Sequence, residues 1–223
     1  QVAWPDSTRI TVRAANSCRN ISLDQYTNAV VPGRMYTPQP MILAALFCAV
    51  VASVSAAVPK CDSTITSQLA SLHPSGIPQN IIATLQKNGP YSYVVVSSSE
   101  TSLFGITPQC IGITMRDDDT AAVIYKFPLM PPLSLTFDVK EDNGVLIQTD
   151  GDDYKLYVLY LESGVIVTYR CCDQCTATAP DLGIAVSDKL KSSTATKTAV
   201  VNAKALLKKL KLDSDVVTLR SCS

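Results

Sequence analysis

The chain has 223 residues, which corresponds to one domain or to one domain with additional segments. Its 19 basic and 19 acidic side chains balance, and 17% of its residues are charged, which argues against long solvated tails and against nucleic-acid binding as the main task. With one histidine, His73, any Ser-His or Cys-His catalytic pair has to use that residue. Eight cysteines are many for a cytosolic protein and raise the question of the compartment.

The first expected element is a secretory signal peptide at residues 35–56. Residues 41–57 form an uncharged apolar run that ends in small residues, and Val54-Ser55-Ala56 is the expected cleavage triplet. This run is shorter than the roughly 20 residues that span a bilayer, and a polar segment follows it. A buried core helix is the alternative interpretation.

Residues 1–34 differ from the rest of the chain because all their basic side chains are arginines. We interpret them as upstream sequence read in frame from a transcript, with translation starting at Met35 or Met41. The alternative is a real N-terminal extension, in which Asn20-Ile21-Ser22 is a glycosylation sequon. The expected mature protein is then one secreted, extracellular domain, residues 57–223.

The expected domain begins with a short helix and continues as strands. Pro78 and Asn88-Gly89 bracket the helix, at residues 79–87. Runs rich in β-branched and aromatic residues, separated by turn residues, predict the strands. They span residues 91–97, 110–116, 121–127, 133–140, 145–149, 154–161 and 165–170, with a weaker strand at residues 101–106.

Alternation within these runs indicates which side of each strand is buried. From Leu133 to Lys140, apolar residues occupy the odd positions and polar residues the even ones. Consecutive hairpin-linked strands that each have one solvent-exposed face and one buried face are typical of an up-and-down antiparallel barrel. A two-sheet sandwich gives similar alternation, so periodicity alone leaves both architectures open.

Residues 198–212 predict an amphipathic helix. The apolar face holds Ala199, Ala203, Leu206, Leu207 and Leu210, and the other face holds Lys204, Lys208 and Lys211. We expect this helix to pack on the outside of the strands with its lysines in water. Binding to a membrane surface or to a partner is the alternative.

Three local features, in chain order, resemble motifs of the lipocalin family. Gly89-Pro90-Tyr91 is similar to the Gly-x-Trp motif of the first strand, with tyrosine in place of tryptophan. Thr149-Asp150, followed by Tyr154, resembles the Thr-Asp-x-x-x-Tyr turn between the sixth and seventh strands. Arg170 ends the expected last strand, where lipocalins keep an arginine that packs over the aromatic ring of the first motif. The C-terminal tail is similar to the apolipoprotein D-like branch, which includes invertebrate extracellular lipocalins.

The resemblance implies an all-β fold: an eight-stranded up-and-down antiparallel β-barrel (calycin or lipocalin-like) with a C-terminal α-helix packed outside. It also implies an extracellular carrier that binds one small hydrophobic molecule, such as a pigment, a retinoid or a fatty acid. We expect no enzyme activity, no metal, no cofactor apart from a bound ligand or pigment, no nucleic-acid partner and no membrane span. The expected ligand-binding residues are Val123, Tyr125, Phe127, Leu135, Phe137 and Val139, for which plain core packing is the alternative role.

The expected mature domain keeps six cysteines, an even number that favours disulfides in a secreted chain. By resemblance, Cys110 pairs with Cys222, and Cys61 pairs with Cys171, Cys172 or Cys175, leaving one pair unassigned. Cys172 and Cys175 also have the Cys-x-x-Cys spacing of redox or zinc sites. Two other functions therefore stay open: a thiol-disulfide oxidoreductase that uses Cys172 and Cys175, and a secreted disulfide-stabilised inhibitor or protein-interaction barrel without a bound ligand.

Overall fold

This computed structural model describes residues 11–13, 58–98, 107–128, 131–150, 152–177 and 179–222. The signal peptide, most of the upstream segment and the weaker strand expected at residues 101–106 lie outside the described residues. The interpretations of residues 1–34 and 35–56 therefore stay predictions.

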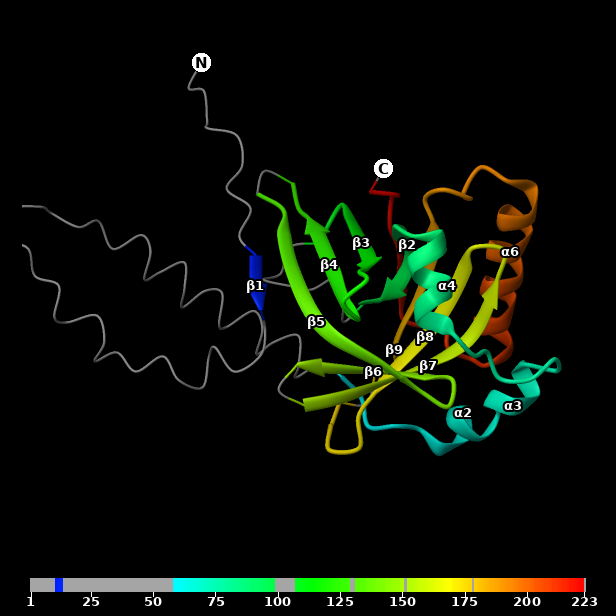
Figure 1. Ribbon diagram of the computed structural model, residues 1–223. Coiled ribbons are helices and arrows are strands. Elements are labelled where there is room, and N and C mark those ends of the chain that lie inside the picture. Colours follow the sequence, from blue (N-terminus) through cyan, green and yellow to red (C-terminus); the bar gives the residue numbers. More distant parts are fainter. Residues whose placement is uncertain are drawn as a thin grey trace, which may run out of the picture.

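Eight antiparallel strands form a closed barrel (Figure 1). They are β2 (Tyr91–Ser97), β3 (Cys110–Met115), β4 (Thr120–Lys126), β5 (Leu133–Asp142), β6 (Val145–Asp150), β7 (Asp152–Glu162), β8 (Val165–Cys171) and β9 (Asp181–Ser187). Each strand pairs with the next one in the chain, and β9 also pairs with β2, so the ring has no open edge within the described residues. These pairings confirm the up-and-down barrel and exclude the sandwich.

All seven strands expected from strong runs are present, but the eighth strand, β9, was missed. Every residue of β9 is buried, because the barrel interior covers one of its faces and a helix covers the other. Such a strand lacks the alternation of apolar and polar residues, and β9, with Gly183 and Ala185 in its centre, also lacks the run of β-branched and aromatic residues that identified β8. The prediction that residues 165–170 form the last strand was therefore wrong.

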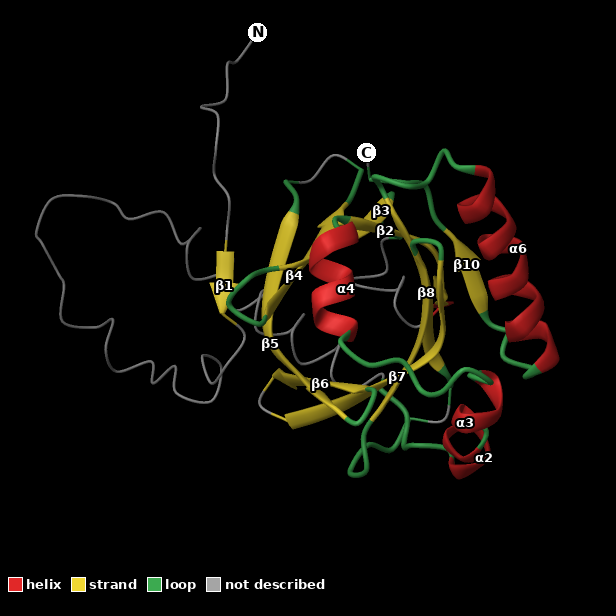
Figure 2. Ribbon diagram, turned by 45° about the vertical axis from the view of Figure 1, so that its right-hand side comes forward, coloured by secondary structure: helices red, strands yellow, loops and turns green. Residues whose placement is uncertain are grey.

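One end of the barrel is covered by α4 (Ile81–Asn88), which lies across the opening in Figure 2. The Gln86 side chain donates a hydrogen bond to the carbonyl of Arg116 in the β3–β4 turn, and the Ile82 amide donates to the Glu141 carboxylate on β5. We call this end, where the β3–β4, β5–β6 and β7–β8 turns lie, the α4 end. The opposite end, which carries the other four interstrand connections, is called the loop end.

The C-terminal helix, α6 (Thr194–Lys209), packs outside the barrel, as expected (Figure 2). Its buried residues Ala199, Ala203 and Leu207 join one apolar cluster with Val165 and Val167 of β8. Among the described residues, no helix combines the length and apolar character needed to cross a membrane. The remaining elements are α2 (Ser63–Ser67), α3 (Leu69–Leu72), β10 (Val216–Thr218), which pairs with β2, and β1 (Thr11–Arg13), which pairs in parallel with β5.

Three disulfides join the six cysteines of the barrel domain. Cys110 on β3 is bonded to Cys222 in the C-terminal tail, and Cys61 is bonded to Cys171 at the end of β8. Both pairings agree with those implied by the resemblance. The pair that was left unassigned is Cys172–Cys175.

Candidate functional site

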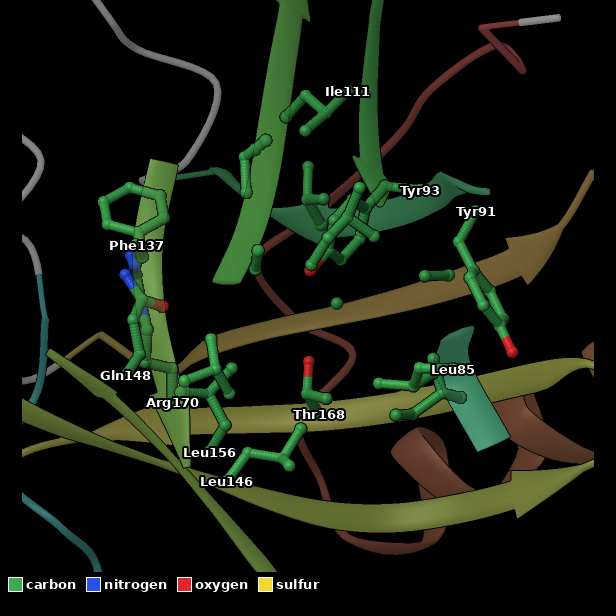
Figure 3. Close-up of a pocket in the computed structure, with 18 of the residues that line it drawn as sticks. Leu85, Tyr91, Tyr93, Ile111, Phe137, Leu146, Gln148, Leu156, Thr168 and Arg170 are labelled. Atoms are coloured by element: carbon green, nitrogen blue, oxygen red, sulfur yellow. The ribbon is translucent and has the colours of Figure 1, made fainter. Parts of the chain in front are cut away.

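The barrel encloses a cavity of about 90 Å³ that is lined by α4 and by all eight barrel strands. On β3, β4, β5, β6 and β8, the lining residues alternate along the strand. On β8, Ile166, Thr168 and Arg170 line the cavity, whereas Val165 and Val167 belong to the cluster beneath α6. The cavity is therefore the interior of the barrel and not a surface groove (Figure 3).

The α4 end of the cavity is mainly apolar, and its polar group is the buried Tyr91 hydroxyl. Leu85 of α4 and Tyr91 of β2 lie together at this end in Figure 3 and are 5% and 2% exposed. Desolvation on burial raises the pKa of Tyr91 to about 12, so the phenol stays neutral at physiological pH. Gly89, which joins the helix to the strand, is required sterically, because a Cβ atom there would lie 2.9 Å from the carbonyl oxygen of Leu85.

The loop end of the cavity contains an ion pair. The Nε atom of Arg170 lies 2.6 Å from Oδ2 of Asp181, and the side chains are 13% and 6% exposed. The Ser97 hydroxyl donates to Oδ1 of Asp181 at 3.4 Å, and the Arg170 guanidinium lies 5.8 Å from the centre of the Tyr154 ring. Gln148 of β6 lines the same end and is 8% exposed (Figure 3). The cavity therefore has one mainly apolar end and one polar end.

The role expected for Arg170 by resemblance was wrong. Tyr91 pairs with Ser187 at one end of β9, and Arg170 pairs with Asp181 at the other end. The guanidinium therefore packs over Tyr154 and not over Tyr91. The error follows from the missed β9, because Arg170 ends the seventh barrel strand and that strand runs away from the α4 end.

The position expected for Thr149-Asp150 also has to be corrected. These residues lie at the end of β6, between the fifth and sixth barrel strands, and not between the sixth and seventh. The Thr149 hydroxyl donates a hydrogen bond to the Asp153 carboxylate at 2.8 Å across the β6–β7 hairpin. Thr149 therefore supports a hairpin at the loop end, whereas the turn between the sixth and seventh strands contains Gly164.

The six expected ligand-binding residues are brought together inside the barrel. Val123, Tyr125, Phe137 and Val139 line the cavity. Phe127 and Leu135 are buried in an apolar cluster with Tyr125 and Phe137 but are not part of the lining. Their role in binding stays a prediction.

The sequence analysis did not predict Gln148, Thr168 or Asp181 as site residues, and it named Arg170 only as a structural residue and not as part of the cavity lining. For Gln148 and Thr168 the sequence does contain a signal, because residues two positions apart in a strand lie on the same face. Gln148 is two positions from Leu146, and Thr168 is two positions from Ile166, and both apolar residues face inward. For Asp181 no such signal exists, because β9 itself was not predicted.

The remaining chemically reactive candidates have structural contacts. Cys172 and Cys175 are bonded to each other, and Cys172 is 4% exposed beside Val58 and Tyr154. This pair lies in the β8–β9 connection and not at the helix N-terminus that redox motifs favour. The Nε2 atom of His73 lies 2.7 Å from the carbonyl oxygen of Val158. Within the described residues, no group of three or more side chains is arranged to hold a metal ion.

Comparison with known proteins gives matches only among solved structures, since no protein-family model and no curated protein matches the chain. Apocrustacyanin C2 matches with a TM-score of 0.48 and 14% identity, over 75% of this chain and 91% of that one. The siderocalin Ex-FABP matches with a TM-score of 0.43 and 16% identity, over 62% and 96% of the two chains. A bovine odorant-binding protein variant matches with a TM-score of 0.42 and 14% identity, over 58% and 91%. The fold assignment rests on the strand pairings and not on these scores.

Proposed function

We propose that this protein is a secreted carrier that binds a small, mainly apolar molecule inside its barrel and acts without catalysis. The observation that supports this is the cavity inside the barrel, lined by α4 and by every barrel strand. Binding derives from burial: a ligand that removes ~200 Å² of apolar surface from water gains ~5 kcal/mol before association costs. Secretion is supported by the three disulfides, which persist in oxidising compartments.

The size of the cavity limits the ligand. At about 90 Å³ it is smaller than the ~150 Å³ apolar cavity that holds benzene in an engineered protein. A ligand of benzene's size therefore fits after small shifts of the lining side chains. Retinoids, sterols and long-chain fatty acids require large rings such as Tyr93 and Phe137 to leave the interior. We therefore expect the protein to bind ligands of about benzene's size and not retinoids, sterols or long-chain fatty acids.

Titration with toluene, followed by calorimetry, tests the carrier function. Ala121 is 4% exposed and lines the cavity, so Ala121→Leu fills the space that toluene needs. We expect the wild-type protein to bind toluene and Ala121→Leu to bind it at least tenfold more weakly. The matched control, Ala205→Leu, adds the same atoms on the exposed face of α6 and leaves binding unchanged.

Thermal unfolding of each variant shows that it is folded, and Val123→Leu offers a second filling substitution in the same lining. Equal toluene binding by the wild-type protein and by both filled variants would place the ligand elsewhere. If the wild-type protein bound neither toluene nor any other aromatic molecule of similar size, the carrier function would be contradicted.

A second candidate is a secreted barrel that acts on a protein partner through its loops. The small cavity favours it, because the rings of Tyr91, Tyr93, Tyr125 and Phe137 occupy much of the interior. Native mass spectrometry of the protein purified from its source separates the two candidates. A carrier retains a small molecule at stoichiometric amounts, whereas an interaction barrel retains none.

A further inference from the structure

The loop end of the cavity holds two buried charges, Arg170 and Asp181, which are neighbours on the paired strands β8 and β9. Moving an ion out of water costs several kcal/mol, and a salt bridge recovers this cost only when its geometry is good and further hydrogen bonds are made. The pair of Arg170 and Asp181 meets both conditions, with its 2.6 Å contact and the Ser97 hydroxyl on the carboxylate. Both residues line the cavity. They therefore form a fixed polar wall that faces the space inside the barrel.

Gln148 extends this wall and lacks a protein partner. The residue is 8% exposed and lines the cavity, and within the described part of the chain no hydrogen bond to its carboxamide is found. Because its carboxamide lines the cavity without a protein partner, it can bond to a molecule there, which favours ligands that supply a donor or an acceptor. In Figure 3, Gln148 and Arg170 lie together, on the opposite side of the cavity from Leu85 and Tyr91.

From this arrangement we propose that the cavity selects small neutral molecules that carry one hydroxyl or carbonyl group, with that group held at Gln148, Arg170 and Asp181. This inference rests on the proposed function. The polar group lies at the loop end, and the apolar body of the ligand lies toward Leu85 and Tyr91 at the α4 end.

Charge explains why the selected group is neutral. The Arg170 guanidinium and the Asp181 carboxylate compensate each other at 2.6 Å, so the wall has no net charge. A ligand anion is attracted by the guanidinium but repelled by the carboxylate beside it, and a ligand cation is attracted by the carboxylate but repelled by the guanidinium. Neither ion therefore recovers the free-energy cost of leaving water. A hydroxyl group both donates and accepts, and a carboxamide such as that of Gln148 satisfies either role. Phenols and small aromatic alcohols are therefore the expected ligand class.

Four probes of similar size test this selectivity by calorimetry at neutral pH. Toluene has no polar group, p-cresol adds one neutral hydroxyl, benzoate is an anion and benzylammonium is a cation. We expect p-cresol to bind about two- to tenfold more tightly than toluene, because a hydrogen bond contributes about 0.5–1.5 kcal/mol net. Benzoate and benzylammonium are expected to bind at least tenfold more weakly than p-cresol.

The variant Gln148→Leu tests the assignment of the polar group. We expect its ratio of toluene to p-cresol dissociation constants to fall close to one. The same substitution at the exposed Gln109 is the matched control and keeps the wild-type ratio. Denaturant unfolding of both variants verifies the fold, and if Gln148→Leu is unfolded, Gln148→Met repeats the test with an unbranched side chain.

The outcomes distinguish the two proposals. If toluene and p-cresol bind equally well to the wild-type protein, or if benzoate or benzylammonium binds more tightly than p-cresol, the selectivity inference is overturned and the carrier function stands. An unchanged preference for p-cresol in the folded Gln148 variants also overturns it. If none of the four probes binds, the carrier function itself fails.

Discussion

At the scale of single residues, Gly183 determines where the Tyr93 ring lies inside the barrel. A Cβ atom on Gly183 would lie 2.5 Å from Cε1 and 2.8 Å from Cδ1 of Tyr93. Real Cβ atoms do not approach other atoms so closely, so the ring occupies space that only glycine leaves free. Because both residues line the cavity, this contact also contributes to the shape of the cavity.

The substitution Gly183→Ala therefore pushes the Tyr93 ring into the cavity. We expect the free energy of unfolding to fall by about 1–3 kcal/mol, which is typical of an overpacked interior, and toluene affinity to fall with it. The control is Gly112→Ala, where the nearest atoms lie at 3.6 Å in ordinary contact. Urea unfolding of both variants measures the difference, and an equal effect at the two positions would contradict this account of Tyr93.

At the scale of elements, α6 stabilises the outer wall of the barrel through its first turn. The Ser193 hydroxyl accepts a hydrogen bond from the Thr196 amide at 3.0 Å and caps the helix. The Thr196 hydroxyl donates to the carbonyl of Ser163 at 2.7 Å, which joins the start of the helix to the β7–β8 turn. The cap therefore orients the helix that covers β8 and β9.

We expect Ser193→Ala to lower the free energy of unfolding by about 1 kcal/mol, because the first helical turn loses its acceptor. Ser192→Ala is the matched control, since that residue is exposed and lies just outside the capping position, and its effect stays within about 0.5 kcal/mol. Equilibrium denaturation measures both. A loss at Ser192 as large as that at Ser193 would show that the cap is not the cause.

At the scale of the whole molecule, two disulfides connect the ends of the domain to the barrel. Cys61–Cys171 and Cys110–Cys222 join residues 110 and 112 positions apart, whereas Cys172–Cys175 joins residues three positions apart. In the chain-entropy model, a crosslink stabilises more when the loop that it closes is longer. The long-range disulfides therefore dominate the contribution of the cysteines to stability.

Replacing Cys110 and Cys222 by serine is expected to lower the free energy of unfolding by about 4–5 kcal/mol, and the same change at Cys172 and Cys175 by about 2 kcal/mol. Denaturant unfolding without reductant measures both double variants. A larger loss for the Cys172 and Cys175 variant would contradict the chain-entropy account for this protein.

Most of the barrel was predictable from local patterns. In β5 the apolar residues Leu135, Phe137 and Val139 alternate with polar ones, and this pattern can be read from the sequence alone. Of the polar positions, Asp138 and Lys140 are exposed, whereas Ser134 and Thr136 are buried. The same parity placed Val123, Tyr125, Phe137 and Val139 in the cavity wall. β9 was not predictable in this way, since it is covered on both faces and, with Gly183 and Ala185 in its centre, has no β-rich run like that of β8.

By itself, the sequence determined seven strands, two helices, the inward face of the central strands and the even number of cysteines, all of which follow from neighbours in the chain. Only the tertiary structure decided that β9 closes the ring, that Cys172 pairs with Cys175, and that Arg170 faces Asp181 and Tyr154 at the loop end. The physical reason is that closure, disulfide partners and ion pairs depend on distances between strands. Those distances are set by the register of the whole barrel, which local periodicity does not encode.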